Sequence, residues 1–118
     1  MSMMLTREVR DTYVWFGLSG PSDVAELMAH LKTIGQDAQA RALSAIAIDL
    51  LMMQSRVTTA DRFSLGEAAA VALRGIDRIA VIQPPSELRG FAAMVASNRG
   101  TAAESFTSLA DAEGWLRG

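Results

Sequence analysis

The segment from residue 44 to residue 75 limits the choice of fold more than any other part of the chain. It opens with a short apolar run that ends in a carboxylate, Ala45–Asp49, and closes with an alanine-rich stretch at 59–73. A continuous apolar run of this length is typical of a buried strand, and the second stretch has the composition of a helix. We therefore predict a strand, a crossing loop at Leu50–Val57 and a helix at 59–73.

The rest of the chain alternates in the same way. In the first part of the chain we predict strands at 3–9 and 12–18 that form a hairpin, followed by a helix that starts at Ser19-Gly20-Pro21 with Asp23 and Glu26 in its first turn. The strand and helix described above come next, with a stop at Gly75. The last part contains a strand at 79–82, a helix capped by Ser86, a strand at 104–107, and a helix capped by Ser108 with Asp111. Strands that alternate with helices are typical of a parallel sheet with right-handed crossovers, and the hairpin adds an antiparallel edge. We expect an α/β fold of order ββαβαβαβα, a mixed, mostly parallel sheet of about five strands with about four helices.

Length and charge restrict the classes of function. The 118 residues suit a single domain, 1–118, with an ordinary apolar fraction of 50%. A net charge of −2 with scattered arginines gives no basic surface, so we do not expect a nucleic-acid partner. The first charges, Arg7 and Glu8, precede any apolar run long enough for a signal peptide, and no run reaches the ~18 residues of an integral membrane segment. We expect a cytoplasmic protein.

Few residues suit catalysis or metal binding. The chain has no cysteine and one histidine, His30, which lies beside the apolar stripe of the first predicted helix. We read His30 as a structural residue, because no nucleophile is tied to it in the sequence. No calcium-loop spacing and no phosphate-cradling glycine loop is present. We expect no enzyme, no metal and no cofactor, and a hydrolase or transferase that uses Thr58, Thr59, Asp61 and His30 is the third choice of function.

Thr58-Thr59-Ala60-Asp61 is the first candidate site. As structure, Thr58 caps the helix and Asp61 completes a capping box, which accounts for the pattern without any function. As function, a phosphate on Thr58 or Thr59 would add about two negative charges at a helix N-terminus, within reach of Arg56 or Arg62. Both interpretations remain open from the sequence.

Two loops at the same end of the sheet are the second candidate. Leu51, Met52 and Met53 continue the apolar character past Asp49, so they either cover the sheet end or present an adaptable surface to a protein, lipid or acyl chain. Gln83 and Ser86 belong to the second loop, which adds another helix N-terminus. Arg62 and Gln83 are either polar groups of such a pocket or solvated residues.

Several further segments of the chain form a recognisable set. They are Asp49, the stretch Thr-Thr-Ala-Asp-Arg-Phe-Ser-Leu-Gly-Glu at 58–67, Arg78-Ile-Ala-Val-Ile, Asn98-Arg99-Gly100, Phe106-Thr107, Ala112 and Trp115-Leu116. Together these segments resemble the SpoIIAA-like family of small bacterial proteins. The resemblance implies a STAS-type fold related to anti-sigma factor antagonists, with a link to the CRAL-TRIO type of lipid-binding domain. In the antagonists a phosphorylatable serine caps the helix after a strand-end aspartate, and Asp49 and Thr58 hold that spacing. This chain has Thr-Thr-Ala-Asp where the antagonists have Asp-Ser-Ser-Gly. The resemblance therefore implies a site at the same position, the start of this helix, more than it implies phosphorylation there.

The resulting hypothesis is a non-catalytic regulatory or binding domain. Its candidate ligand- or partner-binding residues are Leu51, Met52, Met53, Arg56, Thr58, Thr59, Asp61, Arg62, Gln83 and Ser86. The alternative is a carrier or sensor of an apolar small molecule or lipid, with peripheral membrane contact through residues 50–53. Trp115 or the edge hairpin is available for a homodimer, although the same residues would also serve to close the core.

Overall fold

A computed structural model describes residues 3–10, 12–21, 23–54, 59–84 and 102–117. The elements are β1 (Met4–Val9), β2 (Val14–Pro21), α1 (Val24–Ala40), β3 (Ala45–Gln54), α2 (Thr59–Ala72), β4 (Arg78–Ile82), β5 (Ala103–Phe106) and α4 (Leu109–Leu116). The five strands form one sheet in the order β1-β2-β3-β4-β5, in which β1 and β2 are antiparallel and every other pair is parallel. The predicted α/β class and mixed sheet are confirmed, while the helix predicted after Ser86 lies outside the described residues.

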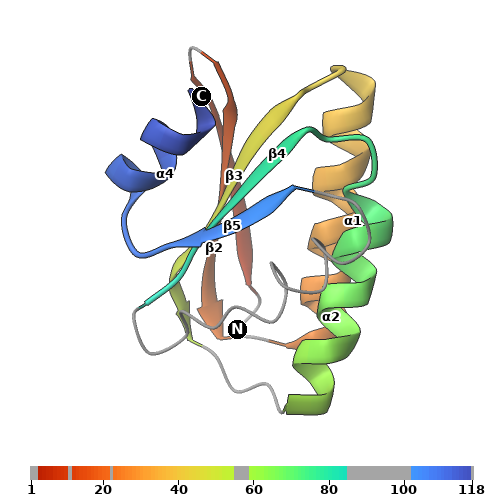
Figure 1. The fold of residues 1–118 in the computed structure, drawn as a ribbon. Helices are drawn as coiled ribbons and strands as arrows, with labels where there is room; N and C mark the ends of the chain where they lie inside the picture. The colour runs from red at the N-terminus through yellow and green to blue at the C-terminus, as the bar shows by residue number, and fades with distance from the viewer. Residues whose placement is uncertain (1–2, 11, 22, 55–58, 85–101, 118) are drawn as a thin grey trace.

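The helices cover the two faces of the sheet unequally. Because β2, β3 and β4 follow one another across the sheet, right-handed crossovers place α1 and α2 on the same face. Figure 1 shows these two helices on one side of the sheet and the short α4 on the other. Side chains alternate along β2 and the residue before it, since Phe16 belongs to the core under α1 and α2, and Tyr13 and Trp15 belong to the cluster under α4.

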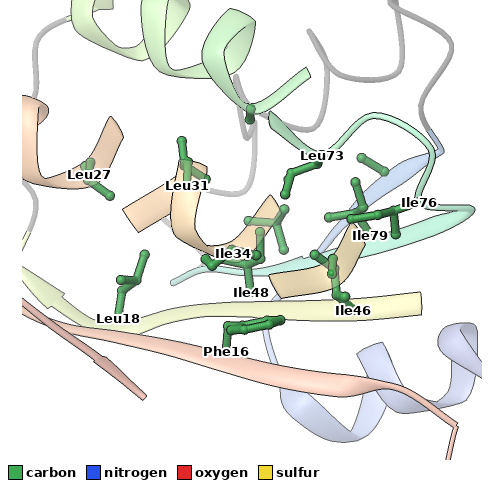
Figure 2. Close-up of a cluster of buried hydrophobic side chains, with 14 of the residues drawn as sticks. Phe16, Leu18, Leu27, Leu31, Ile34, Ile46, Ile48, Leu73, Ile76 and Ile79 are labelled. Carbon is green, nitrogen blue, oxygen red and sulfur yellow. The ribbon is translucent and has the colours of Figure 1, made fainter. Parts of the chain in front are cut away.

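The main core fills the space between the sheet and the helices α1 and α2 (Figure 2). Ile34 of α1, Ile46 of β3 and Leu73 after α2 are at most 2% exposed. The two helices meet closely at Gly35, where an added Cβ would overlap the carbonyl oxygen of Ala72 and lie 2.8 Å from its carbonyl carbon. A glycine at this crossing therefore sets the distance between α1 and α2.

Local signals account for the starts of α1 and α4 and for the stop after α2. The Asp23 carboxylate accepts hydrogen bonds from the backbone N–H groups of Ala25 and Glu26, and the Ser108 hydroxyl accepts one from Asp111 N–H at 3.2 Å. Gly75 has φ +87°, a conformation that glycine adopts at little cost, and it provides the predicted stop after α2. Within the described ranges, no helix combines the length and hydropathy that a membrane span requires.

Two predicted boundaries are wrong, and they share one cause. The predicted loop from Leu50 onward is strand as far as Gln54, and Pro21, predicted at a helix start, is the last residue of β2. These extensions pair with one another, with Ser19 opposite Met52 and Pro21 opposite Gln54. Backbone pairing between the two parallel strands therefore continues past the point where the side-chain pattern changes. Proline is tolerated at position 21 because β1, the other neighbour of β2, begins opposite Ser19 and does not reach Pro21. The proline nitrogen therefore interrupts no hydrogen bond between β1 and β2.

Candidate functional site

The carboxyl ends of the parallel strands meet at one edge of the sheet. β2, β3, β4 and β5 end there, and α2 begins at the same edge, which is the lower one in Figure 1. Helix N-termini and strand ends together offer exposed backbone groups and side chains at one place. This edge carries the described part of the predicted site.

The last residues of β3, Leu50–Gln54, form a strand extension that we call the β3 tip. Leu51 is 40% exposed and Met52 is 75% exposed, whereas Leu50 and Met53 are half-buried against the main core. The sequence allowed two interpretations of this segment, a cover for the end of the sheet or an exposed surface for a ligand or partner. Each interpretation applies to part of the tip. Leu50 and Met53 anchor it, and Leu51 and Met52 are displayed.

An irregularity in strand register determines which way Met52 faces. Gly17 lies opposite Asp49, yet Ser19 lies opposite Met52, so β3 contains one more residue than β2 over this step. Because β2 continues its alternation, Ser19 lies on the same face as Trp15, and so does Met52. The exposed methionine thus belongs to the α4 side of the sheet.

Asp49 holds the chain at this irregularity. Its Oδ2 accepts a hydrogen bond from Trp15 Nε1–H at 3.1 Å, and its Oδ1 accepts one from the backbone N–H of Leu51 at 3.0 Å. The Trp15 ring lies over Gly17, where an added Cβ would come within 2.7 Å of ring carbon Cζ2. The carboxylate thereby ties β2 to β3 and fixes the direction of the tip. The sequence identified Asp49 as a residue of the site but did not identify Trp15. The only indication for Trp15 was its large side chain with a polar N–H group, on the face of the strand opposite Phe16.

The remaining candidate residues differ in their burial and in whether the structure describes them. Asp61 is half-buried in the first turn of α2, and Gln83 is only 4% exposed, with its backbone N–H bonded to Phe106 O at 2.8 Å. Burial excludes the solvated interpretation of Gln83, while its role in binding stays a prediction. Arg56, Thr58 and Ser86 lie outside the described residues, as do the side chains of Thr59 and Arg62.

The groups with shifted pKa values lie away from this edge. Burial, together with the hydrogen bond that Tyr13 Oη donates to Glu113 at 2.6 Å, raises the pKa of Tyr13 to about 12. Burial alone would raise the pKa of Asp37, but hydrogen bonds from Arg41 and Arg7 outweigh it and lower that pKa below its ordinary value. These contacts attach α4 to the residue before β2, and α1 to β1.

Neither a histidine site nor a metal site emerges from the described ranges. His30 is half-buried on α1, and its Nε2 is buried with no hydrogen-bond partner among the residues that the structure describes. Among the residues that the structure describes, no three His, Asp or Glu side chains come together in a way that could hold a metal ion. The features that characterise the candidate site are therefore the apolar side chains of the β3 tip and the groups around them.

Comparison with known proteins identifies the fold. No protein-family model matches the chain, and no curated protein does. Among solved structures, it is similar to an anti-sigma factor antagonist from Mycobacterium paratuberculosis, with a TM-score of 0.70 and 16% identity over 99% of this chain and 96% of the other. It is also similar to an uncharacterised protein with a SpoIIAA-like fold from Shewanella loihica, with a TM-score of 0.60 and 22% identity over 98% and 93% of the two chains. The chain therefore has the SpoIIAA-like, STAS-type fold.

Proposed function

We propose that this chain is a non-catalytic regulatory domain that binds a protein partner through the β3 tip. The observation that carries the proposal is the exposure of two adjacent large apolar side chains, Leu51 and Met52, at the carboxyl edge of the sheet. Exposed apolar surface at the edge of a sheet is typical of contact sites, and the unbranched methionine side chain adapts to differently shaped partners.

The way the tip is held supports the same proposal. Asp49 fixes the backbone of Leu51 on one side and the Trp15 indole on the other, and Met53 anchors the end of the strand in the core. A surface whose backbone is already ordered loses less conformational entropy when a partner binds. The tip is thus organised for contact before any partner arrives.

The fold favours a protein as the occupant. One structure of the same fold is that of an anti-sigma factor antagonist, a protein whose named role is to oppose another protein. Thr58 and Thr59 remain sequence-based candidates for a phosphate that would control such binding from the start of α2. The alternative, a lipid or another apolar ligand at Leu51 and Met52, uses the same side chains and must be separated by experiment.

A site-specific cross-linking experiment tests the proposal. The chain contains no cysteine, so a Met52→Cys variant is labelled with a photoreactive group at one site only. Val71→Cys is the matched control, because Val71 is an apolar residue of α2 that is 61% exposed. We expect the purified chain labelled at position 52 to capture a defined protein from a cell extract, and the chain labelled at position 71 to capture none. Equal capture from the two positions would contradict the proposal, and a cross-link to lipid alone would favour the alternative.

A further inference from the structure

Strand β1 forms an open edge of the sheet. It lies outside β2 in the strand order and is six residues long, whereas the opposite edge strand, β5, has four residues. An edge strand presents backbone N–H and C=O groups that have no partner within the sheet, and another strand of complementary pattern can pair with them. Five of the six β1 residues are exposed, so within the described structure this edge is accessible.

One hydrogen bond identifies the backbone groups that point outward. Arg10 N–H donates to Tyr13 O at 2.9 Å, next to the last pair of the β1–β2 ladder. Hydrogen-bonded and non-hydrogen-bonded pairs alternate along an antiparallel ladder, so Glu8, Thr6 and Met4 direct their backbone groups toward β2. The backbone groups of the intervening residues, Leu5, Arg7 and Val9, therefore point away from the sheet.

The side chains of β1 leave this edge open to pairing. The strand contains neither proline nor lysine, the residues that commonly prevent edge-to-edge contact. Its one cation, Arg7, bonds to both carboxylate oxygens of Asp37 at 3.0 and 3.1 Å, so its charge is already compensated. Met4 and Val9 are 63% and 65% exposed and offer apolar surface near the two ends of the strand.

We propose that β1 pairs antiparallel with β1 of a second copy of this chain, which joins two five-stranded sheets into one. A two-fold axis perpendicular to the sheet keeps each residue on its own face, so only residues of the same face lie opposite one another. Pairing centred on Thr6 satisfies this condition and places Leu5 opposite Arg7 and Met4 opposite Glu8. Thr6 then faces its own copy, a pair that is favourable between strands.

Charge selects this register over its neighbours. Centring the pairing on Arg7 would oppose two arginines, and centring it on Glu8 would oppose two glutamates, both of which are unfavourable arrangements. Centring it on Leu5 would leave Arg7, Glu8 and Val9 beyond the end of the partner strand. The Thr6 register alone pairs most of the strand without opposing like charges.

The interface would be small, because few residues of each chain take part. Stable complexes usually bury more than about 1,200 Å² in total, and a single pair of short strands falls at the low end of that scale. We therefore expect a weak dimer whose population rises with protein concentration. This inference concerns the backbone edge of β1 and not the exposed side chains of the β3 tip, and it does not depend on the proposed function.

Engineered cysteines test the register directly, since the natural chain contains none. In the Thr6→Cys variant the two sulfurs would face each other in a non-hydrogen-bonded pair, whose Cα atoms are about 4.5 Å apart and within disulfide range. In the Glu8→Cys control the two cysteines would lie four residues apart along the strands, roughly 14 Å. We expect mild oxidation to link T6C chains and to leave E8C chains unlinked.

A measurement on the unmodified chain completes the test. Hydrogen exchange should slow at the Leu5 and Arg7 amides as the protein concentration rises, in step with dimer formation in sedimentation velocity, while the inward Thr6 amide stays protected throughout. A chain that remains monomeric, with concentration-independent exchange at Leu5 and Arg7, would overturn the pairing. Cross-linking of E8C in preference to T6C would overturn the register.

Discussion

Replacing Gly35 with alanine tests the closest approach in the fold, the crossing of α1 and α2. The added methyl group would overlap the carbonyl oxygen of Ala72 and lie 2.8 Å from its carbonyl carbon. An ordinary contact at this point needs more than about 3.4 Å, and the obstacle is helix backbone, which cannot turn aside as a flexible side chain can. The two helices must therefore separate, which opens the core around Ile34 and Leu73.

The magnitude follows from two opposing effects. Forcing an extra carbon into a packed interior costs about 1 to 3 kcal/mol, and helix distortion places Gly35→Ala at or above the upper end. Alanine in place of glycine returns up to about 1 kcal/mol through helix propensity. We expect a net loss of about 2 kcal/mol in the free energy of unfolding, or a melting temperature lower by roughly 6 to 10 °C for a domain of this size.

Gly114→Ala is the matched control for this experiment. Gly114 lies inside α4, and an added Cβ there would have no atom of the described residues within 4 Å apart from its chain neighbours and the backbone of its own helix. The same substitution should therefore stabilise the protein, by up to about 1 kcal/mol. Urea denaturation followed by circular dichroism measures both variants. A Gly35→Ala protein as stable as the unmodified chain would refute the packing argument.

Two further predictions concern hydrogen bonds made by the side chains of Tyr13 and Asp49. Tyr13 is the only tyrosine, so tyrosinate absorbance reports its pKa, which should be about 12 in the folded protein and about 10 in denaturant. Because the folded state holds the proton more tightly, this contribution to stability is complete below about pH 10 and is lost, to the extent of about 2 to 3 kcal/mol, as the pH rises toward 12. Native titration near pH 10 would contradict the buried contact with Glu113. In the second prediction, Asp49→Ala removes the acceptor for Trp15 and Leu51, so the indole N–H resonance should shift and stability should fall by about 2 to 3 kcal/mol. Asp49→Asn, which keeps an acceptor oxygen, should lose less, and equal losses in the two variants would argue against the hydrogen bonds.

The side-chain pattern predicted the class of fold and most of its elements, because apolar periodicity determines which faces are buried. The buried run Ala45–Asp49, now the first half of β3, is one example, and the Ser108 cap of α4 is another. These features depend on residues close to one another in the sequence.

The ends of β2 and β3 could not be predicted in the same way. Residues 50–54 continue as strand because backbone groups of Ser19–Pro21 lie beside them, and that pairing joins segments thirty or more residues apart. The extra residue in β3, which turns Met52 toward the α4 side, likewise depends on register between strands and leaves no local pattern. Trp15 was missed as a part of the site for the same reason, since its partner Asp49 lies on another strand.

The most direct test of the proposed function is the affinity of the chain for the protein captured from position 52. Met52→Glu places a charge on the exposed side chain, and Val71→Glu does the same on a comparably exposed residue of α2. Burying a methionine contributes about 1.5 to 3 kcal/mol, so its loss should weaken binding at least about tenfold. We predict that loss for M52E and unchanged affinity for V71E, measured by titration calorimetry on variants of equal stability. Unchanged affinity in M52E would contradict a role of the β3 tip in binding.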